Sequence, residues 1–300
     1  MWVPTAVPSA LAGLLDALRC PACGGALQAS QNMLRCSHGH TFDLARAGYV
    51  SLLSGSGATS GDDDEMARAR QRFLATGAYA PLLEAIGDLA ESHVPDLAAD
   101  APRSSSPAPT ILDAGCGPGY YLAGLLDRFP AARGLGFDTS VRSLRFAARS
   151  HDRAAVCSAD VFAPLPLADG CADLLLDAFA PRNPTEFARV LRPGGSLIVV
   201  RPLEGHLAQL RELVPGMVAV DPHKEERVHA ALDPHFAETA RRELHVDLSL
   251  SAETARDLAW MTPSARHLEV ADLDAALARL DPASPPPVTV SVLISVHRPR

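Results

Sequence analysis

Residues 111–120 read ILDAGCGPGY, and this stretch decides the fold of the 300-residue chain. Two apolar residues and an acid lead to three glycines at alternate positions, which predicts a buried strand ending in a tight turn into a helix. Glycine adopts positive φ at little cost and lets a ligand approach the bare backbone. We therefore expect a ligand at this turn, held by Asp113, Gly115, Gly117 and Gly119.

The spacing of the turn indicates which ligand it holds. Asp-x-Gly-x-Gly-x-Gly differs from the Gly-x-Gly-x-x-Gly of dinucleotide-binding proteins, whose pyrophosphate needs an anion cradle. S-adenosylmethionine (SAM) carries a sulfonium and an amino-acid end but no phosphate, so an acid beside the turn suits it. About 20 residues further on, Asp138 ends a second apolar run, where a carboxylate accepts hydrogen bonds from ribose hydroxyls. With Pro193-Gly194-Gly195 before another strand, this predicts a SAM-dependent methyltransferase; an ordinary glycine-rich turn is the alternative.

From residue 110 onward, apolar runs alternate with helical patterns, which is typical of a parallel sheet with helices on both faces. The expected strands are 110–114, 134–138, 154–158, 172–177, 195–200, 243–250 and 287–297. The expected helices lie near 119–129, 140–150, 184–191, 206–213, 221–233 and 270–281. The fold class is thus α/β, a doubly wound, mostly parallel, seven-stranded Rossmann-like sheet whose closing strand is a candidate antiparallel edge.

A second motif lies near the N-terminus. Cys20 and Cys23 form one close pair, and Cys36 and His40 form another after twelve intervening residues. Two such pairs joined by a short hairpin are the arrangement of a closed tetrahedral Cys₃His zinc site, and four protein ligands make it structural rather than catalytic. His38 is the competing fourth ligand, with poorer reach, and free buried cysteines beside a surface histidine are the alternative to any metal.

The chain divides into three segments by these patterns. Residues 1–60 form an N-terminal extension, amphipathic to about residue 18, and the zinc-binding module; residues 61–105 form a helical linker; residues 106–300 form the methyltransferase domain. Helices are expected at Met66–Tyr79, after acids that suit a helix start, and at 81–93. Compositional linkers are expected at 54–61 and 100–109.

Composition limits the partners. The net charge of −8 argues against strong non-specific binding to nucleic acid, although it leaves room for a local basic patch. No apolar run reaches the roughly 18 residues that a membrane helix needs, and the N-terminus lacks the positive region of a signal peptide. A cytoplasmic protein without membrane contact is the expectation.

Several motifs in order resemble the 23S rRNA (guanine-N1)-methyltransferases. The resemblance covers most of the chain, because the sequence of zinc module, helical linker and SAM core is more specific than either motif alone. It rests on the zinc pairs, Phe42-Asp43, Gly48-Tyr49-Val50, Glu65-Met66, Ala69-Arg70, Phe73-Leu74, Gly77, Tyr79, the glycine turn, Ala180-Pro181, Ala188-Arg189-Val190, Pro193-Gly194-Gly195, His206-Leu207 and Met261-Thr262-Pro263.

The resemblance implies methylation of guanine N1 in hairpin 35 of 23S rRNA by a homodimer. The alanine- and arginine-rich composition is associated with the branch of the family that gives resistance to tylosin-like macrolides, and it favours this branch over the housekeeping branch. By residue match, the resemblance implies that Tyr79, Gly117, Pro118 and His206 contact SAM.

Two residues, one at the end of the fourth strand and one just after it, are candidates for the chemistry. Guanine N1 bears a proton that has to leave, and Asp177 is the candidate acceptor, with a solvated loop acid as the alternative. A target guanine has to be unpaired or flipped and stacked, and Phe179 is the candidate stacking residue, with an ordinary core phenylalanine as the alternative. Asp160, after the third strand, is either an acceptor for the adenine amino group or a loop acid.

Two other functions are compatible with the residues alone. The first is methylation of a small molecule with a purely structural zinc module, which the acidic net charge favours. The second is a non-catalytic partner protein, which the intact glycine turn and Asp138 oppose.

Overall fold

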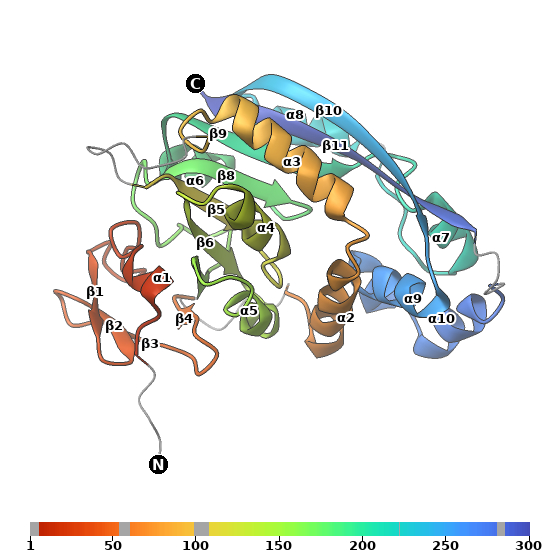
Figure 1. The fold of residues 1–300 in the computed structure, drawn as a ribbon, viewed down its shortest axis with the longest axis horizontal. Coiled ribbons are helices and arrows are strands. Elements are labelled where there is room, and N and C mark those ends of the chain that lie inside the picture. Colours follow the sequence, from red (N-terminus) through yellow and green to blue (C-terminus); the bar gives the residue numbers. More distant parts are fainter. Residues whose placement is uncertain (1–5, 54–60, 99–107, 222, 281–285) are drawn as a thin grey trace, which may run out of the picture.

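The structure, a computed structural model, describes residues 6–53, 61–98, 108–221, 223–280 and 286–300. Most of the two linkers expected at 54–61 and 100–109 lies outside these residues. Figure 1 shows a small N-terminal sheet beside a large sheet that carries helices on both faces.

The strands form two sheets within the described residues. The small sheet contains, in spatial order, β1 (Leu27–Ser30), β2 (Met33–Cys36) and β3 (Thr41–Asp43). The large sheet contains, in spatial order, β10 (Phe236–Ser249), β11 (Pro287–Pro299), β9 (Leu191–Pro202), β8 (Ala172–Ala178), β5 (Thr110–Ala114), β6 (Arg133–Asp138), β7 (Ala154–Ser158) and β4 (Val50–Ser51).

Helices are interspersed with these strands. They are α1 (Ser9–Ala12), α2 (Asp64–Ala75), α3 (Ala80–His93), α4 (Tyr120–Arg128), α5 (Val141–Ala147), α6 (Pro184–Val190), α7 (Ala208–Leu213), α8 (Lys224–Leu232), α9 (Ala252–Trp260) and α10 (Val270–Leu277), with a 3₁₀ helix at Pro263–His267. No helix in the described ranges has the length and apolar character needed to cross a bilayer.

The order of the parallel strands fixes where a ligand binds. From β9 to β4 every neighbouring pair is parallel, and the chain runs outward from β5 to β6 and β7 before returning to β8 on the other side. The topological switch point therefore lies between β5 and β8, and ligands of such sheets bind outside the carboxyl ends of the strands at this point. The glycine turn follows β5 directly, so the predicted ligand site and the switch point coincide.

The alternation of side chains along β5 shows why both faces of the sheet are covered. Ile111 belongs to the apolar cluster formed with α3 and α4, whereas Leu112 belongs to the cluster on the opposite face. That second cluster contains Leu27 and Leu34 of the small sheet as well as Phe187 of α6. The N-terminal module thus covers part of one face of the sheet and shares its core.

The structure confirms the α/β class and differs from the expected strands in three ways. The large sheet has eight strands, one more than expected, because Val50 and Ser51 pair with β7 at the far edge. The closing strand β11 is antiparallel as expected but lies inside the sheet, between β9 and β10, so that β10 forms the edge. β10 begins at Phe236 rather than near 243, because its polar, half-exposed residues give little apolar alternation.

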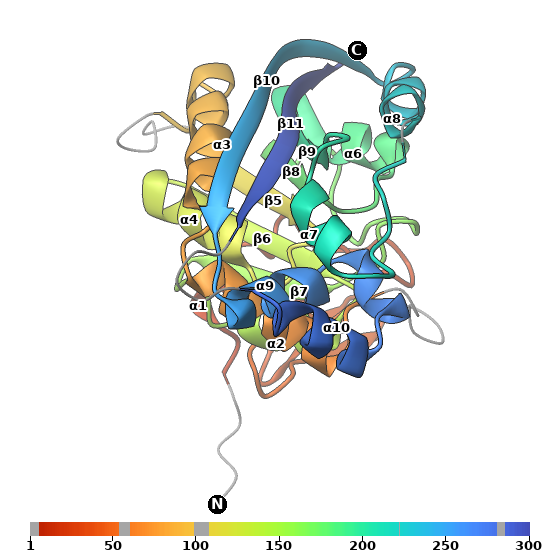
Figure 2. The ribbon, with the colours of Figure 1, turned by 90° about the vertical axis from the view of Figure 1, so that its right-hand side faces the viewer.

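The sequence patterns missed α9, which packs against α2 and α10. Figure 2 shows these three helices gathered at one end of the sheet. The capping signal is present, since the Ser251 hydroxyl accepts a hydrogen bond from the N–H of Thr254. The helix has only nine residues, so its apolar stripe is too short to stand out from the flanking loops.

Candidate active site

The glycine turn between β5 and α4 requires its glycines. Gly115, Gly117 and Gly119 have φ values of 67°, 53° and 85°, a region that side chains disfavour. A Cβ at Gly115 would lie 2.6 Å from the Cβ of Ala180, and one at Gly119 would lie 2.6 Å from Oγ of Ser150. Both the backbone conformation and the close packing of Ala180 and Ser150 therefore require glycine at this turn.

A cavity of about 680 Å³ opens at this turn. Six of the predicted site residues line it: Tyr79, Gly115, Gly117, Pro118, Asp138 and Phe179. Asp160 lines it as well. Asp113, Gly119, Asp177 and His206 do not line it. The volume is in the range of pockets that hold cofactors of drug-like size.

Asp138 is held by the backbone at the end of β6. One carboxylate oxygen accepts a hydrogen bond from the N–H of Gly117 at 2.9 Å, and the other accepts from the N–H of Ser140 at 2.7 Å. Burial raises the pKa of Asp138, although the two hydrogen bonds favour the carboxylate and lower the pKa in part. A carboxylate has about four acceptor positions, so capacity for further donors remains. This is the geometry expected of a ribose-binding acid at a switch point.

Asp113 lies beneath the turn rather than in the cavity. It is buried at the end of β5, and its Oδ2 atom has no hydrogen-bond partner among the described residues. Burial raises the pKa of Asp113 well above its ordinary value, and the charges of Asp138 and Asp177 add to this effect. A cationic ligand above the turn would relieve this crowding of acids, so the site fits a sulfonium cofactor better than a phosphate-bearing one.

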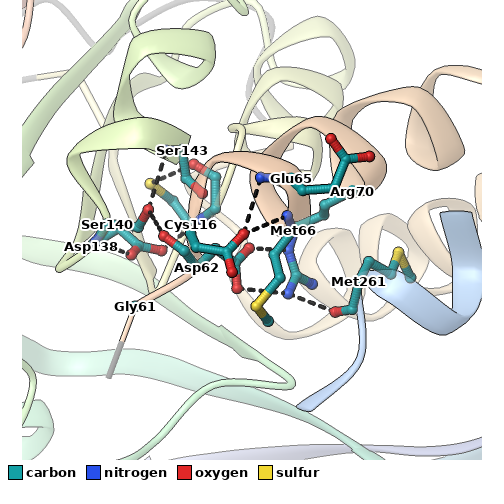
Figure 3. Close-up of polar contacts among 12 residues, drawn as sticks. Gly61, Asp62, Glu65, Met66, Arg70, Cys116, Asp138, Ser140, Ser143 and Met261 are labelled. Atoms are coloured by element: carbon teal, nitrogen blue, oxygen red, sulfur yellow. Dashed lines mark hydrogen bonds and ion pairs between the residues drawn. The ribbon is translucent and has the colours of Figure 1, made fainter. Parts of the chain in front are cut away.

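Arg70 forms a strap across one wall of the cavity that the sequence patterns did not reveal. Its guanidinium contacts Asp62 at 2.7 and 3.2 Å and donates to the carbonyl of Met261 at 2.7 Å (Figure 3). Its Cδ atom would lie 3.2 Å from a Cβ at Gly117. Arg70 thus joins the linker helix α2 to the end of α9, directly beside the glycine turn.

Helix α2 makes both local contacts, which the sequence predicts, and contacts with distant residues, which it does not. Asp63 is the N-cap of α2 and accepts from the N–H groups of Glu65 and Met66, as expected for the acidic run. Arg72 forms a fork to Asp257 of α9, with contacts of 2.6 to 3.1 Å. Asp257, the partner of Arg72, and Met261, the partner of Arg70, lie 185 and 191 residues further along the chain, and no local pattern signals either contact.

Three rings form a row beside the cavity, and two of them line it. The centroid of Phe179 lies 6.4 Å from that of Tyr79 and 5.9 Å from that of His206, with interplanar angles near 38° and 36°. Phe179 is 37% exposed and adopts φ of 59°, which is uncommon for a residue with a side chain. A second cavity, of about 400 Å³, adjoins this row and is lined by Tyr79, Phe179 and His206.

Asp177 is fully buried at the end of β8 and does not reach either cavity. One of its oxygens receives the Nε–H of Arg182 at 2.6 Å, and the other receives the N–H of Ala180 at 3.2 Å. Both bonds close the loop that carries Phe179. This geometry differs from that of a proton acceptor facing substrate.

The four predicted metal ligands converge in the N-terminal module. Sγ of Cys20, Cys23 and Cys36 and Nδ1 of His40 all lie within 4.8 Å of one another. Nδ1 of His40 lies 3.6 Å from Sγ of Cys20 and 3.3 Å from Sγ of Cys36. Sγ of Cys23 lies 3.8 Å from Sγ of Cys36. A tetrahedron with Zn–S bonds of about 2.3 Å has edges of about 3.8 Å, so the donor set fits zinc.

The alternative ligand His38 is less well placed. Its Nδ1 atom approaches only Cys23, at 3.5 Å, whereas His40 contacts both Cys20 and Cys36. Burial opposes ionisation of Cys36, but hydrogen bonds from the backbone at His40 and His38 and from the His40 ring lower the pKa of the Cys36 thiol to about 6. The thiolate form that zinc binds is thereby favoured.

Comparison with known proteins matches both parts of the chain. Residues 18–55 match the zinc-ribbon family described as RlmA, N-terminal, and residues 111–195 match a methyltransferase domain family. A putative 23S rRNA (guanine-N(1)-)-methyltransferase of Micromonospora griseorubida is 41% identical, covering 95% of this chain and 98% of its own. A 23S rRNA (guanine(748)-N(1))-methyltransferase of Streptomyces fradiae is also 41% identical, over 94% of this chain and 96% of its own. A third relative, from Bacillus subtilis strain 168, is 36% identical and covers 65% of this chain and 68% of its own.

Proposed function

Because the chain belongs to the family of SAM-dependent 23S rRNA (guanine-N1)-methyltransferases, we propose that it methylates N1 of a guanine in hairpin 35 of 23S rRNA. The observation that carries this proposal is the identity of 41% across the zinc ribbon, the linker and the catalytic core together. The name of the Streptomyces fradiae relative specifies guanine 748, and we propose the same nucleotide here. Resistance to tylosin-like macrolides is the proposed consequence.

We assign the cofactor-binding role to the residues that line the larger cavity. SAM supplies a methyl group already activated by its sulfonium, so the protein has mainly to position the partners. Gly115, Gly117 and Pro118 line the cavity beside the cofactor, and Asp138 offers its remaining acceptor capacity to the ribose. Arg70 lies beside Gly117 in the wall of this cavity, and we assign it to the cofactor carboxylate.

We assign the acceptor base to the side of Phe179 that faces both cavities. Its ring is exposed and lies in a row with Tyr79 and His206, so a flipped guanine has an aromatic surface on which to stack. The strained φ of Phe179 is held by the bonds of Asp177 to Arg182 and Ala180. We therefore propose Asp177 as a positioning residue in place of the proton acceptor that the sequence suggested.

Replacing Phe179 by alanine is expected to lower kcat/KM for rRNA by about 5- to 150-fold, because stacking on an aromatic side chain contributes about 1–3 kcal/mol per base. Phe179→Tyr keeps the ring and should retain most of the activity. Steady-state kinetics with saturating SAM give the ratio, and calorimetry should show SAM affinity nearly unchanged. Wild-type kinetics in the alanine variant would remove Phe179 from the acceptor site.

The remaining assignments follow from the proposed substrate. We propose that the zinc ribbon docks on the rRNA, since it lies outside the cofactor cavity and its metal makes it rigid. A homodimer and a cytoplasmic location belong to the same proposal, on the strength of the family resemblance.

A direct test incubates the purified protein with labelled SAM and unmodified 23S rRNA and maps the product by reverse transcription. Methylation at N1 blocks Watson–Crick pairing. The expected result is therefore a new stop in hairpin 35, one nucleotide on the 3′ side of guanine 748, where reverse transcriptase halts before the modified base. Expression in a tylosin-sensitive host that lacks the modification should raise the tolerated drug concentration. Label that stays out of rRNA while SAM still binds would contradict the proposal and favour a small-molecule acceptor.

A further inference from the structure

Helix α5 carries three arginines on one face. Arg142, Arg145 and Arg149 stand at positions i, i+3 and i+7, with Arg149 in the turn that ends the helix, and all three are exposed. This face extends over about 10 Å at 1.5 Å per residue. Arg142 lies 3.3 Å from Asp64 of α2 in a pair that is exposed on both sides. No carboxylate of the described residues pairs with Arg145 or Arg149.

Two features of this arrangement are unfavourable in the free protein, although Arg145 in the last turn of α5 suits the helix dipole. Residues 141–150 contain no acid, so the helix offers no internal partner for its arginines. Like charges spaced by three or four residues repel one another on a helix surface. Arg142 also stands in the first turn, where the helix dipole disfavours a cation. A polyanion on this face would relieve both effects.

Two further arginines extend the same surface. Arg68 is exposed on α2, which packs against α5. Arg46 is exposed in the tight turn that links the zinc ribbon to β4, where the N–H of Gly48 donates to the carbonyl of Ala45. A Cβ at Gly48 would lie 3.7 Å from the Cβ of Ala148, so this turn packs directly on the end of α5.

The helix spans the distance between the two functional parts. Its N-cap is Ser140, whose hydroxyl donates to the carbonyl of Asp62 in the cavity wall, and the preceding residue Thr139 lines the cavity. It ends against the turn of the zinc ribbon. Figure 1 shows α5 between the small sheet and α2. Helix α5 therefore lies on the direct path between the ribbon and the cavity, which an RNA that contacts both would follow.

We propose that the arginine strip, composed of Arg46, Arg68, Arg142, Arg145 and Arg149, is a phosphate-binding bridge for the rRNA backbone. Arginine forks bind phosphate oxygens in pairs, and their charge is permanent. The net charge of −8 repels a polyanion from the rest of the surface, so a local basic strip also sets the orientation of approach. The inference rests on the proposed rRNA substrate and adds the surface that receives its backbone.

The test measures how binding of unmodified 23S rRNA depends on salt. Each phosphate contact adds about 0.7 to 0.9 to the slope of log affinity against log salt concentration. The triple variant Arg142→Gln, Arg145→Gln, Arg149→Gln should therefore lower this slope by about two to three and raise KM for rRNA. Affinity for SAM, measured by calorimetry, should not change, and the triple lysine variant should restore most of the slope.

Matched controls separate the strip from charge in general. Arg279→Gln and Arg298→Gln remove exposed arginines from α10's end and from β11, and they should leave the slope at the wild-type value. If the triple variant is unstable, Arg145→Gln alone should lower the slope by about one. If a folded variant keeps the wild-type slope and KM while the wild-type protein methylates rRNA, the arginine strip does not bind the rRNA backbone but the proposed function is retained. Wild-type protein that neither binds nor methylates rRNA would overturn the proposed function and the strip together.

Discussion

Replacing Gly115 by valine should abolish measurable SAM binding and lower rRNA methylation by at least about 100-fold, the cost of a misplacement of about 1 Å at a reacting centre. The Cβ would lie 2.6 Å from Ala180, in a backbone of φ 67° that β-branched residues avoid. To remove the clash with Ala180, either the loop that carries Phe179 or the glycine turn itself has to move. Either movement displaces a wall of the cavity.

Calorimetric titration with SAM and thermal unfolding distinguish a lost site from a lost fold. The strain costs about 1–3 kcal/mol, so the variant should unfold a few degrees lower and remain folded at 25 °C. Gly13→Ala is the matched control, because its Cβ meets only ordinary contacts of 3.5 Å or more and its φ is −71°. A Gly115→Val protein that binds SAM within threefold of wild type would show that the turn does not form the cofactor site.

Removing the zinc ligand Cys23 is expected to abolish rRNA methylation and to release the metal. Cys23→Ser leaves three ligands, and structural zinc in small modules contributes about 10–16 kcal/mol of apparent folding free energy. The small sheet is too short to build a core of its own. Its Leu27 and Leu34 pack in the core of the large sheet, so the loss should also lower the unfolding temperature of the whole chain.

Metal content, calorimetric unfolding and SAM titration test this expectation together. SAM affinity measured well below the unfolding temperature should remain close to wild type, because none of the zinc ligands lines the cofactor cavity. Cys171→Ser is the control, a half-buried cysteine outside the cluster. Full methylation by a zinc-free Cys23→Ser protein would falsify the structural role of the metal.

Much of the fold was predictable because its signals are local. The strand before Gly115 is a buried run that ends in a turn only glycine tolerates, and both features are written in ten adjacent residues. The zinc ligands are likewise fixed by short spacings, which limit the ways in which two pairs can converge. The same holds for Asp138, which closes its strand and meets the glycine turn through the backbone.

The parts that escaped prediction depend on contacts between distant residues. The strap of Arg70 needs Asp62 and the carbonyl of Met261, and only the packing of α9 on α2 brings them together. Val50 and Ser51 form a strand only because β7 offers a free edge more than 100 residues later. Asp177 looked like a loop acid or a base, and its burial with Arg182 could be known only from the folded loop.

The interior position of β11 has a consequence for biosynthesis. Residues 287–299 insert between β9 and β10, both made earlier, so these two strands have no partner on that side until residues 287–299 have been synthesised. Pairings that span so much sequence are slow to form, and unpaired edges invite aggregation meanwhile. β10 carries charged residues, among them Arg241, Arg242 and Glu243, which are of the kind that oppose association of exposed strand edges.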